Sequence, residues 1–142
     1  MALPQAFTCP VRVYYEDTDA AGVVYYANYL RYLERARTEW LDSIAHPLDE
    51  LQRAHGVVFV VRHVDCDFRL PARLFDRLCV SVEILSAGHA SLVMRQAVRR
   101  GDDLLVDARV KLASIAAGTF RPVRIPLPLA AFLAGSATMS PP

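Results

Sequence analysis

Three carboxylates stand within four residues near the start of the chain, in the segment 15–28, which reads YEDTDAAGVVYYAN. They are Glu16, Asp17 and Asp19, and Gly22 and the expected start of a helix follow them. Such a loop places acids beside the free backbone N–H groups of a helix N-terminus, where the helix dipole favours negative charge. A carboxylate next to amides that can stabilise an oxyanion is what transfer of an acyl group to water requires.

Two non-catalytic interpretations of this loop compete with that one. An acidic loop before a helix usually caps the helix or forms a solvated turn, and composition alone favours this interpretation. A calcium-binding loop would need another acidic ligand at its end, where the chain has only apolar and aromatic residues, Val23, Val24, Tyr25 and Tyr26. The pattern therefore argues against a calcium loop and leaves a structural and a catalytic role open.

Other residues capable of chemistry are dispersed along the chain. The four histidines and three cysteines show no metal-ligand spacing and no CxxC pair, so we expect neither a metal nor another cofactor. No serine stands in a G-x-S-x-G context, which argues against a serine hydrolase. Glu34 could be catalytic, but we expect it to pair with Arg31 or Arg37 and to be structural.

A long helix is expected over residues 28–43, with Asn28 capping its N-terminus. Its apolar face consists of residues spaced three or four apart, Tyr29, Leu33, Ala36, Trp40 and Ile44, bordered by Leu30, Arg37 and Leu41. Charged residues occupy the opposite face of this helix. A helix with one heavily aromatic side needs a sheet to pack against.

Apolar and polar residues alternate over most of the remaining chain, which indicates strands. The expected strands are residues 7–15, 57–68, 77–85, 91–99 and 104–115, with a short helix at 48–54 and a terminal helical turn at 129–134. One long helix beside a run of antiparallel strands predicts an α+β fold. We expect a single domain over residues 1–135 and a flexible C-terminal tail over 136–142.

Charge and hydropathy restrict the partners and the compartment. The chain has 142 residues and a net charge of +1, without a basic run, which argues against a nucleic-acid partner. No apolar run is long enough to span a bilayer, so no membrane insertion is expected. Residues 1–10 lack the pattern of a signal peptide, and we expect a cytoplasmic protein with reduced cysteines.

The segment 11–41, VRVYYEDTDAAGVVYYANYLRYLERARTEWL, closely resembles the YbgC-type acyl-CoA thioesterases. These belong with the 4-hydroxybenzoyl-CoA thioesterase branch of the hotdog superfamily. The resemblance continues through residues 59–62 and 71–74 and becomes weak after about residue 86. It implies a hotdog fold, in which an antiparallel sheet wraps around one long central helix. It also implies hydrolysis of acyl-CoA thioesters to a free acid and CoA.

The resemblance also implies roles for individual residues. Asp19, the second Asp of the D-x-D pair, would be the catalytic carboxylate, acting as nucleophile or general base. The backbone amide of Tyr26 would be the oxyanion donor, and the substrate-binding positions would be Tyr15, Gly22 and Tyr25. Many YbgC-type members have His at the position of Tyr26, and Tyr cannot replace His as an acid or base, since it ionises near ~10 rather than ~6.5. Only the backbone role of Tyr26 is therefore carried over.

The family's assembly and cellular setting are further expectations. The unbroken apolar run VVFVV at residues 57–61 lacks the Pro or charge that protects a free sheet edge, and we expect a homodimer or homotetramer with a shared site. YbgC-type proteins are associated with the Tol-Pal envelope system and phospholipid metabolism, so an acyl carrier protein or lipid-synthesis enzymes could be partners. The alternatives are a non-catalytic acyl-carrier or protein-binding hotdog module and a hotdog hydratase.

Overall fold

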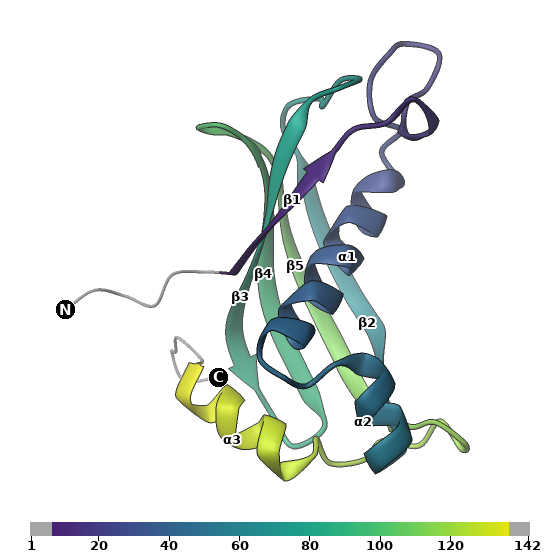
Figure 1. Ribbon diagram of the computed structural model, residues 1–142, viewed down its shortest axis with the longest axis vertical. Helices are drawn as coiled ribbons and strands as arrows, with labels where there is room; N and C mark the ends of the chain where they lie inside the picture. Colours follow the sequence, from purple (N-terminus) through teal and green to yellow (C-terminus); the bar gives the residue numbers. More distant parts are fainter. Residues whose placement is uncertain (1–6, 137–142) are drawn as a thin grey trace, which may run out of the picture.

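The computed structural model of the protein describes residues 7–136 (Figure 1). The helices are α1 (Asn28–Ser43), α2 (Leu48–His55) and α3 (Leu127–Ser136), with a short 3-10 turn at Tyr15–Asp17. The strands are β1 (Phe7–Arg12), β2 (Val57–Phe68), β3 (Arg77–Ala87), β4 (Ser91–Arg100) and β5 (Asp103–Ala116). Residues 137–142, most of the expected C-terminal tail, lie outside the described residues.

The five strands form one sheet in the order β1-β3-β4-β5-β2, and every described pair of neighbours is antiparallel. The long helix α1 lies across one face of this sheet, and the strands curve around it (Figure 1). The structure confirms the expected α+β architecture. Within the described residues, no helix is long and apolar enough to cross a membrane.

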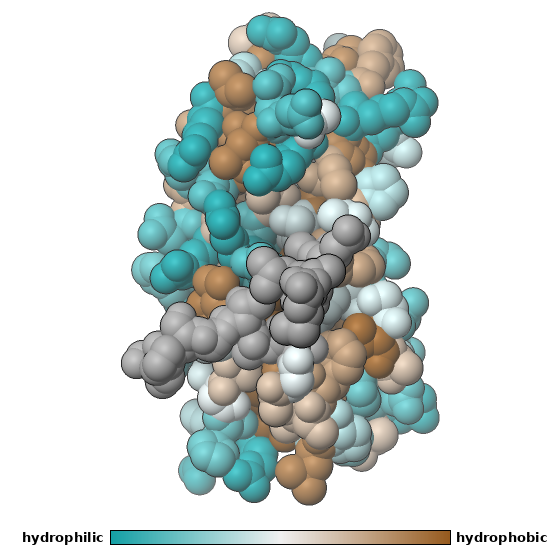
Figure 2. Space-filling model, turned by 90° about the vertical axis from the view of Figure 1, so that its left-hand side faces the viewer, coloured by the Kyte–Doolittle hydropathy of each residue, from teal (hydrophilic) through white to brown (hydrophobic). Residues whose placement is uncertain are grey.

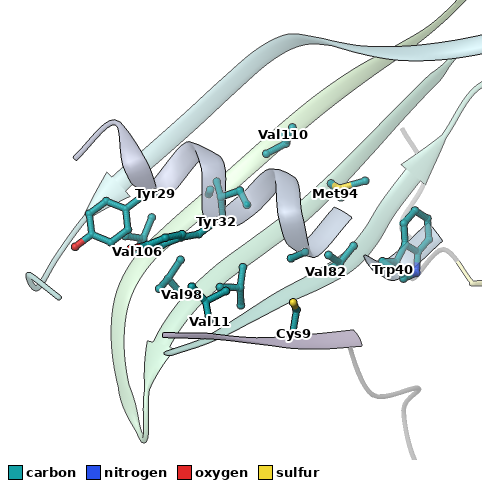
Figure 3. Packing of buried hydrophobic residues seen from close by; sticks show 14 of the residues in the cluster. Cys9, Val11, Tyr29, Tyr32, Trp40, Val82, Met94, Val98, Val106 and Val110 are labelled. Carbon is teal, nitrogen blue, oxygen red and sulfur yellow. The ribbon is translucent and has the colours of Figure 1, made fainter. Parts of the chain in front are cut away.

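The core lies between α1 and the sheet (Figure 3). Alternate residues of β3 face the helix and are buried, as the period-two pattern predicts. The buried residues of α1 are Tyr29, Tyr32, Leu33, Ala36, Trp40 and Leu41. Burying each large apolar side chain contributes about 1.5–3 kcal/mol, so this face fixes α1 on the sheet. The expected face was slightly misplaced, because Tyr32 is fully buried whereas Leu30 is exposed.

A buried glutamine ties the middle of α1 to the sheet. Gln96 of β4 is fully buried, and its amide Nε2 donates to the backbone carbonyls of Leu33 at 3.0 Å and Ser81 at 3.3 Å. Arg37 of α1 donates from its guanidinium to Gln96 Oε1 at 3.0 Å. Burial lowers the pKa of Arg37, and the charge of Glu34 opposes that effect. The helix is therefore held by hydrogen bonds as well as by apolar packing.

Two elements differ in length by three or more residues from the sequence-based expectation. The first strand ends at Arg12 rather than at residue 15, because the chain turns into the 3-10 segment Tyr15–Asp17. The C-terminal helix is longer than one turn, and it buries Leu129 and Leu133 completely. In Figure 2, apolar residues gather in the lower half of the molecule, where α3 lies, while the upper half is mostly hydrophilic.

Candidate active site

The acidic loop folds into a tight turn next to the N-terminus of α1, at the end of the molecule opposite α3 (Figure 1). Asp19 N–H donates to the carbonyl of Val23 at 2.9 Å, and Gly22 N–H donates to the carbonyl of Asp19 at 3.0 Å. Gly22 has φ +77°, in the left-handed region that glycine adopts without strain. The Asp19 carboxylate accepts the Ala21 N–H at 2.9 Å through Oδ1 and is otherwise exposed. The loop thus presents this carboxylate at its surface.

The neighbouring Asp17 is placed quite differently. It is only 8% exposed, and its Oδ2 accepts the Tyr14 N–H at 2.8 Å. Its backbone carbonyl accepts two bonds, from the Tyr25 N–H and from Asn28 Nδ2, each at 2.9 Å. The expectation that Asn28 caps α1 is therefore wrong. The N-cap residue is Ala27, which has no side-chain cap, and the Asn28 amide instead reaches back to the loop.

Among the described residues, the start of α1 leaves the backbone amides of Tyr26 and Ala27 without an acceptor near the loop. The N–H groups of Tyr25 and Asn28 donate to carbonyls, those of Asp17 and Tyr25 respectively. By contrast, we find no acceptor for the Tyr26 N–H anywhere in residues 7–136. Unpaired N–H groups at a helix N-terminus attract negative charge. This amide can therefore stabilise an oxyanion.

An apolar groove lies beside this helix start. Its volume is about 210 Å³, and its lining residues are Val24, Tyr26, Tyr29, Phe68, Arg69, Leu70 and Pro71. The Phe68 ring meets Tyr26 edge to face, with ring centroids 6.0 Å apart, and lies 5.7 Å from Tyr29. The Tyr29 hydroxyl accepts the Ala72 N–H at 3.0 Å, and burial raises the pKa of Tyr29. The end of β2 thus supplies the wall that faces α1.

Comparison with known proteins identifies the family. The family model described as Thioesterase superfamily matches residues 21–107. The chain belongs to this superfamily. It is 40% identical to the acyl-CoA thioesterase YbgC of Haemophilus influenzae over 87% of this chain and 91% of that protein. It is 42% identical to the acyl-CoA thioester hydrolase YbgC of Escherichia coli O6:H1 over 84% of this chain and 90% of that protein.

A solved structure gives the same assignment. The crystal structure of a probable thioesterase from Bartonella henselae is 34% identical, with a TM-score of 0.81, and covers 86% of this chain and 100% of its own. These findings confirm the resemblance to YbgC-type thioesterases, the hotdog fold and the enzyme class that the sequence predicts.

The three predicted substrate-binding residues of this thioesterase lie in different places relative to the groove. Tyr25 is adjacent to the groove, and its ring centroid lies 5.2 Å from that of Tyr26. Tyr15 is 81% exposed in the 3-10 turn and does not line the groove. Gly22 shapes the turn beside Asp19. Phe68 was not predicted as a site residue, and the only signal for it was its aromatic character at the end of an alternating strand.

The remaining candidate, Glu34, has its hydrogen-bond partner within its own helix. Its carboxylate accepts a hydrogen bond from Thr38, one turn along α1. The expected ion pair with Arg31 or Arg37 does not form within the part of the chain that the structure describes, because Arg37 turns inward to Gln96. Residues 7–136 contain no group of three His, Cys, Asp or Glu side chains that could hold a metal ion.

Proposed function

We propose that this protein hydrolyses acyl-CoA thioesters to a free acid and CoA, with Asp19 as the catalytic carboxylate. The observation that carries the proposal is that one short segment carries both an exposed carboxylate and a backbone amide without an acceptor. Asp19 is the first residue of the turn, and the Tyr26 N–H is unpaired where the same segment enters α1. The match to acyl-CoA thioesterases over most of the chain supports this reading.

In the reaction, the thioester carbonyl oxygen accepts the Tyr26 N–H, and its growing negative charge is stabilised by the helix N-terminus. Asp19 either removes a proton from the attacking water or attacks the carbonyl carbon itself. The carbon–sulfur bond then breaks, and CoA leaves as a thiolate that takes up a proton. Direct attack forms a mixed anhydride between the acyl group and Asp19, and water must hydrolyse this anhydride to release the acid. If this water attacks the carbonyl carbon of Asp19, the first acid released in a single turnover in ¹⁸O-labelled water carries an enzyme oxygen, which the general-base route cannot produce.

The side chain of Tyr26 has a packing role in this proposal. Its ring contacts Phe68 and Tyr25, and the residue is 62% exposed. Only its backbone N–H acts on the oxyanion, so the phenol replaces the histidine of many relatives without taking part in the chemistry. The apolar groove beside Tyr26 is then the place for the acyl group.

We also propose that two copies of the chain complete the site. The groove is smaller than the range of about 300–1,000 Å³ that is typical of ligand pockets. Next to it, β2 is an edge strand with one unpaired side, and it exposes Val61, Val64 and Phe68. Pairing of β2 with its two-fold copy would satisfy this edge and enclose the groove. The assembly is a homodimer, which can pair again into a homotetramer.

The proposed setting is the cytoplasm. The cysteines Cys9, Cys66 and Cys79 are all free, which suits a reducing compartment. An acyl carrier protein or lipid-synthesis enzymes as partners, and a link to the Tol-Pal system, stay predictions that rest on the family resemblance alone.

The proposal is tested by thiol release from a panel of acyl-CoAs with short, long and aromatic acyl groups. We expect release from at least one member of the panel by the wild type and loss of this release in Asp19→Ala. The matched control is Asp42→Ala, which removes an exposed carboxylate at the far end of α1. Absence of thiol release from the whole panel would refute the hydrolase proposal and favour a non-catalytic module. Equal activity in Asp19→Ala would refute the role of Asp19.

A further inference from the structure

We propose that Asp17 is a positioning residue for the reaction, and this inference rests on the proposed function. Asp17 joins the two ends of the loop that carries Asp19, and so fixes the Asp19 carboxylate relative to the Tyr26 N–H. It does not touch the substrate in this proposal. Its effect is transmitted through the loop.

The hydrogen bonds of Asp17 connect three parts of the chain. Before the loop, its N–H donates to the Tyr14 carbonyl at 2.9 Å, and its Oδ2 accepts the Tyr14 N–H at 2.8 Å. After the loop, its carbonyl accepts the Tyr25 N–H. The same carbonyl accepts Asn28 Nδ2 from the first residue of α1. Only the bond from the Tyr14 N–H reaches the Asp17 side chain, and the bonds to the loop exit and to α1 are made by its backbone carbonyl. In this proposal the side-chain bond fixes the position of that carbonyl, which holds the exit of the loop and the start of the helix.

The loop between these bonds has little freedom of its own. Thr18 and Val24 form an antiparallel bridge just inside the points that Asp17 joins, and the bond from Asp19 N–H to the Val23 carbonyl closes the next rung. A second contact anchors the exit strand, since Val24 N–H donates to the Ala72 carbonyl at 2.8 Å. The position of Asp19 thus depends on the base of the turn, where its two sides come together, and Asp17 lies at that base.

The burial of Asp17 is a second, independent sign of this role. Asp17, Gln96 and Ser114 are the only buried polar or charged residues among the described ones, and Asp17 is the only carboxylate of the three. Burying a carboxylate is unfavourable unless its bonds repay the lost hydration. The Tyr32 hydroxyl of α1 is also buried there without a hydrogen-bond partner in residues 7–136. Burial first, and then the nearby Asp17 carboxylate, raise the pKa of Tyr32.

This arrangement makes a specific kinetic prediction. Displacing a catalytic group by about 1 Å can reduce a rate ~100-fold. We expect Asp17→Ala to lower kcat by ~10–100-fold and to leave KM nearly unchanged, because the acyl groove is built by other residues. Asp17→Asn should recover much of the lost rate, because its side-chain oxygen can still accept the Tyr14 N–H. The asparagine variant also carries the test if the alanine variant does not fold.

A matched control separates positioning from general destabilisation. Leu129→Ala removes a fully buried side chain of α3, at the end of the molecule opposite the loop (Figure 1). It should lower the melting temperature at least as much as Asp17→Ala while leaving kcat unchanged at a temperature where both variants are folded. Equal kcat losses in the two variants, or a loss in Asp17→Ala that appears only in KM, would overturn the proposal.

Hydrogen–deuterium exchange tests the same inference without relying on activity. In Asp17→Ala, exchange should accelerate in peptides that cover residues 14–28, where the clamped amides lie, and Leu129→Ala should not accelerate exchange there. Unchanged protection of residues 14–28 in Asp17→Ala would show that Asp17 does not hold the loop. If the wild type released no thiol from any acyl-CoA, the proposed function would fail, and the exchange experiment would still decide whether Asp17 clamps the loop.

Discussion

The pair formed by Arg37 and Gln96 offers a quantitative test of how α1 is held on the sheet. Gln96→Leu keeps the approximate volume of the buried side chain and removes all of its hydrogen bonds. The variant loses one bond from the charged Arg37 and two bonds to backbone carbonyls, those of Leu33 and Ser81. The guanidinium is then left partly buried without its acceptor, and this accounts for the larger part of the lost stability.

The expected magnitude follows from these bonds. The charged bond is worth about 1.5–3 kcal/mol and each neutral bond about 0.5–1.5 kcal/mol, while the added apolar burial returns part of this. We therefore expect Gln96→Leu to reduce the free energy of unfolding by about 2–3 kcal/mol. Arg37→Met alone leaves the oxygen of Gln96 unpaired and should cost about 1–2 kcal/mol. The double variant should cost less than the sum, by about 1–2 kcal/mol, because neither residue then has a partner to lose.

Urea denaturation at one fixed protein concentration measures all four proteins of this cycle. A fixed concentration is necessary because self-association would contribute to the apparent stability. If the two single changes added to within about 0.3–0.5 kcal/mol, the residues would be energetically independent. The hydrogen bond from Arg37 would then play no part in holding α1.

Three further predictions concern catalysis, pH and assembly. Asp19→Asn should lower kcat by ~10²–10⁴-fold without changing the melting temperature, whereas Tyr26→Phe should stay within a few-fold of the wild type in the same thiol-release assay. Burial opposes ionisation of Asp76, but the Arg73 N–H and the Arg100 guanidinium outweigh it and hold the pKa of Asp76 below its usual value. A depressed carboxyl pKa stabilises the fold above the unfolded value of about 3.9, and this stabilisation is lost as the pH falls through the folded value. Asp76→Asn should therefore lower the melting temperature at pH 7. In thermal scans the difference from the wild type should begin to shrink as the pH falls below about 4 and should disappear only below the folded pKa of Asp76. Val61→Lys, on the unpaired edge of β2, should weaken self-association in light scattering across a dilution series, and an unchanged mass would contradict the proposed interface.

Local patterns in the sequence were sufficient to predict most of the fold. The spacing of apolar residues predicted α1 as residues 28–43, and alternation predicted β2 as residues 57–68, both with the observed bounds. The short second helix was expected at residues 48–54, and it ends one residue later, at His55, where Gly56 caps it with φ +65°. The errors came where tertiary contacts decide. Asn28 bonds to Asp17, eleven residues earlier, instead of capping its own helix, and propensity alone gives no sign of that choice.

The candidate site was predicted less completely, because some of its residues are neighbours in the sequence and others are far apart in it. The loop that carries Asp19 is continuous in sequence, so its residues could be recognised together. The groove joins this loop to Phe68 and Leu70, more than forty residues later, and only the pairing of β2 with β5 brings that wall to the start of α1. The distinction between an exposed Asp19 and a buried Asp17 also needs the folded chain, since both belong to the same D-x-D pair.

Exposure of the catalytic candidate and the free edge of the sheet have one explanation in common. Electrostatic stabilisation of an oxyanion is strongest where water is excluded, yet Asp19 and Tyr26 are both exposed in a single copy of the chain. The longer of the two edge strands of the described sheet is β2, which has one unpaired side and ends at Phe68, in the wall of the same groove. A copy paired along β2 would therefore cover apolar side chains and exclude water from the groove in a single step. On this argument, loss of self-association in Val61→Lys should be accompanied by loss of thiol release, although Val61 does not line the groove.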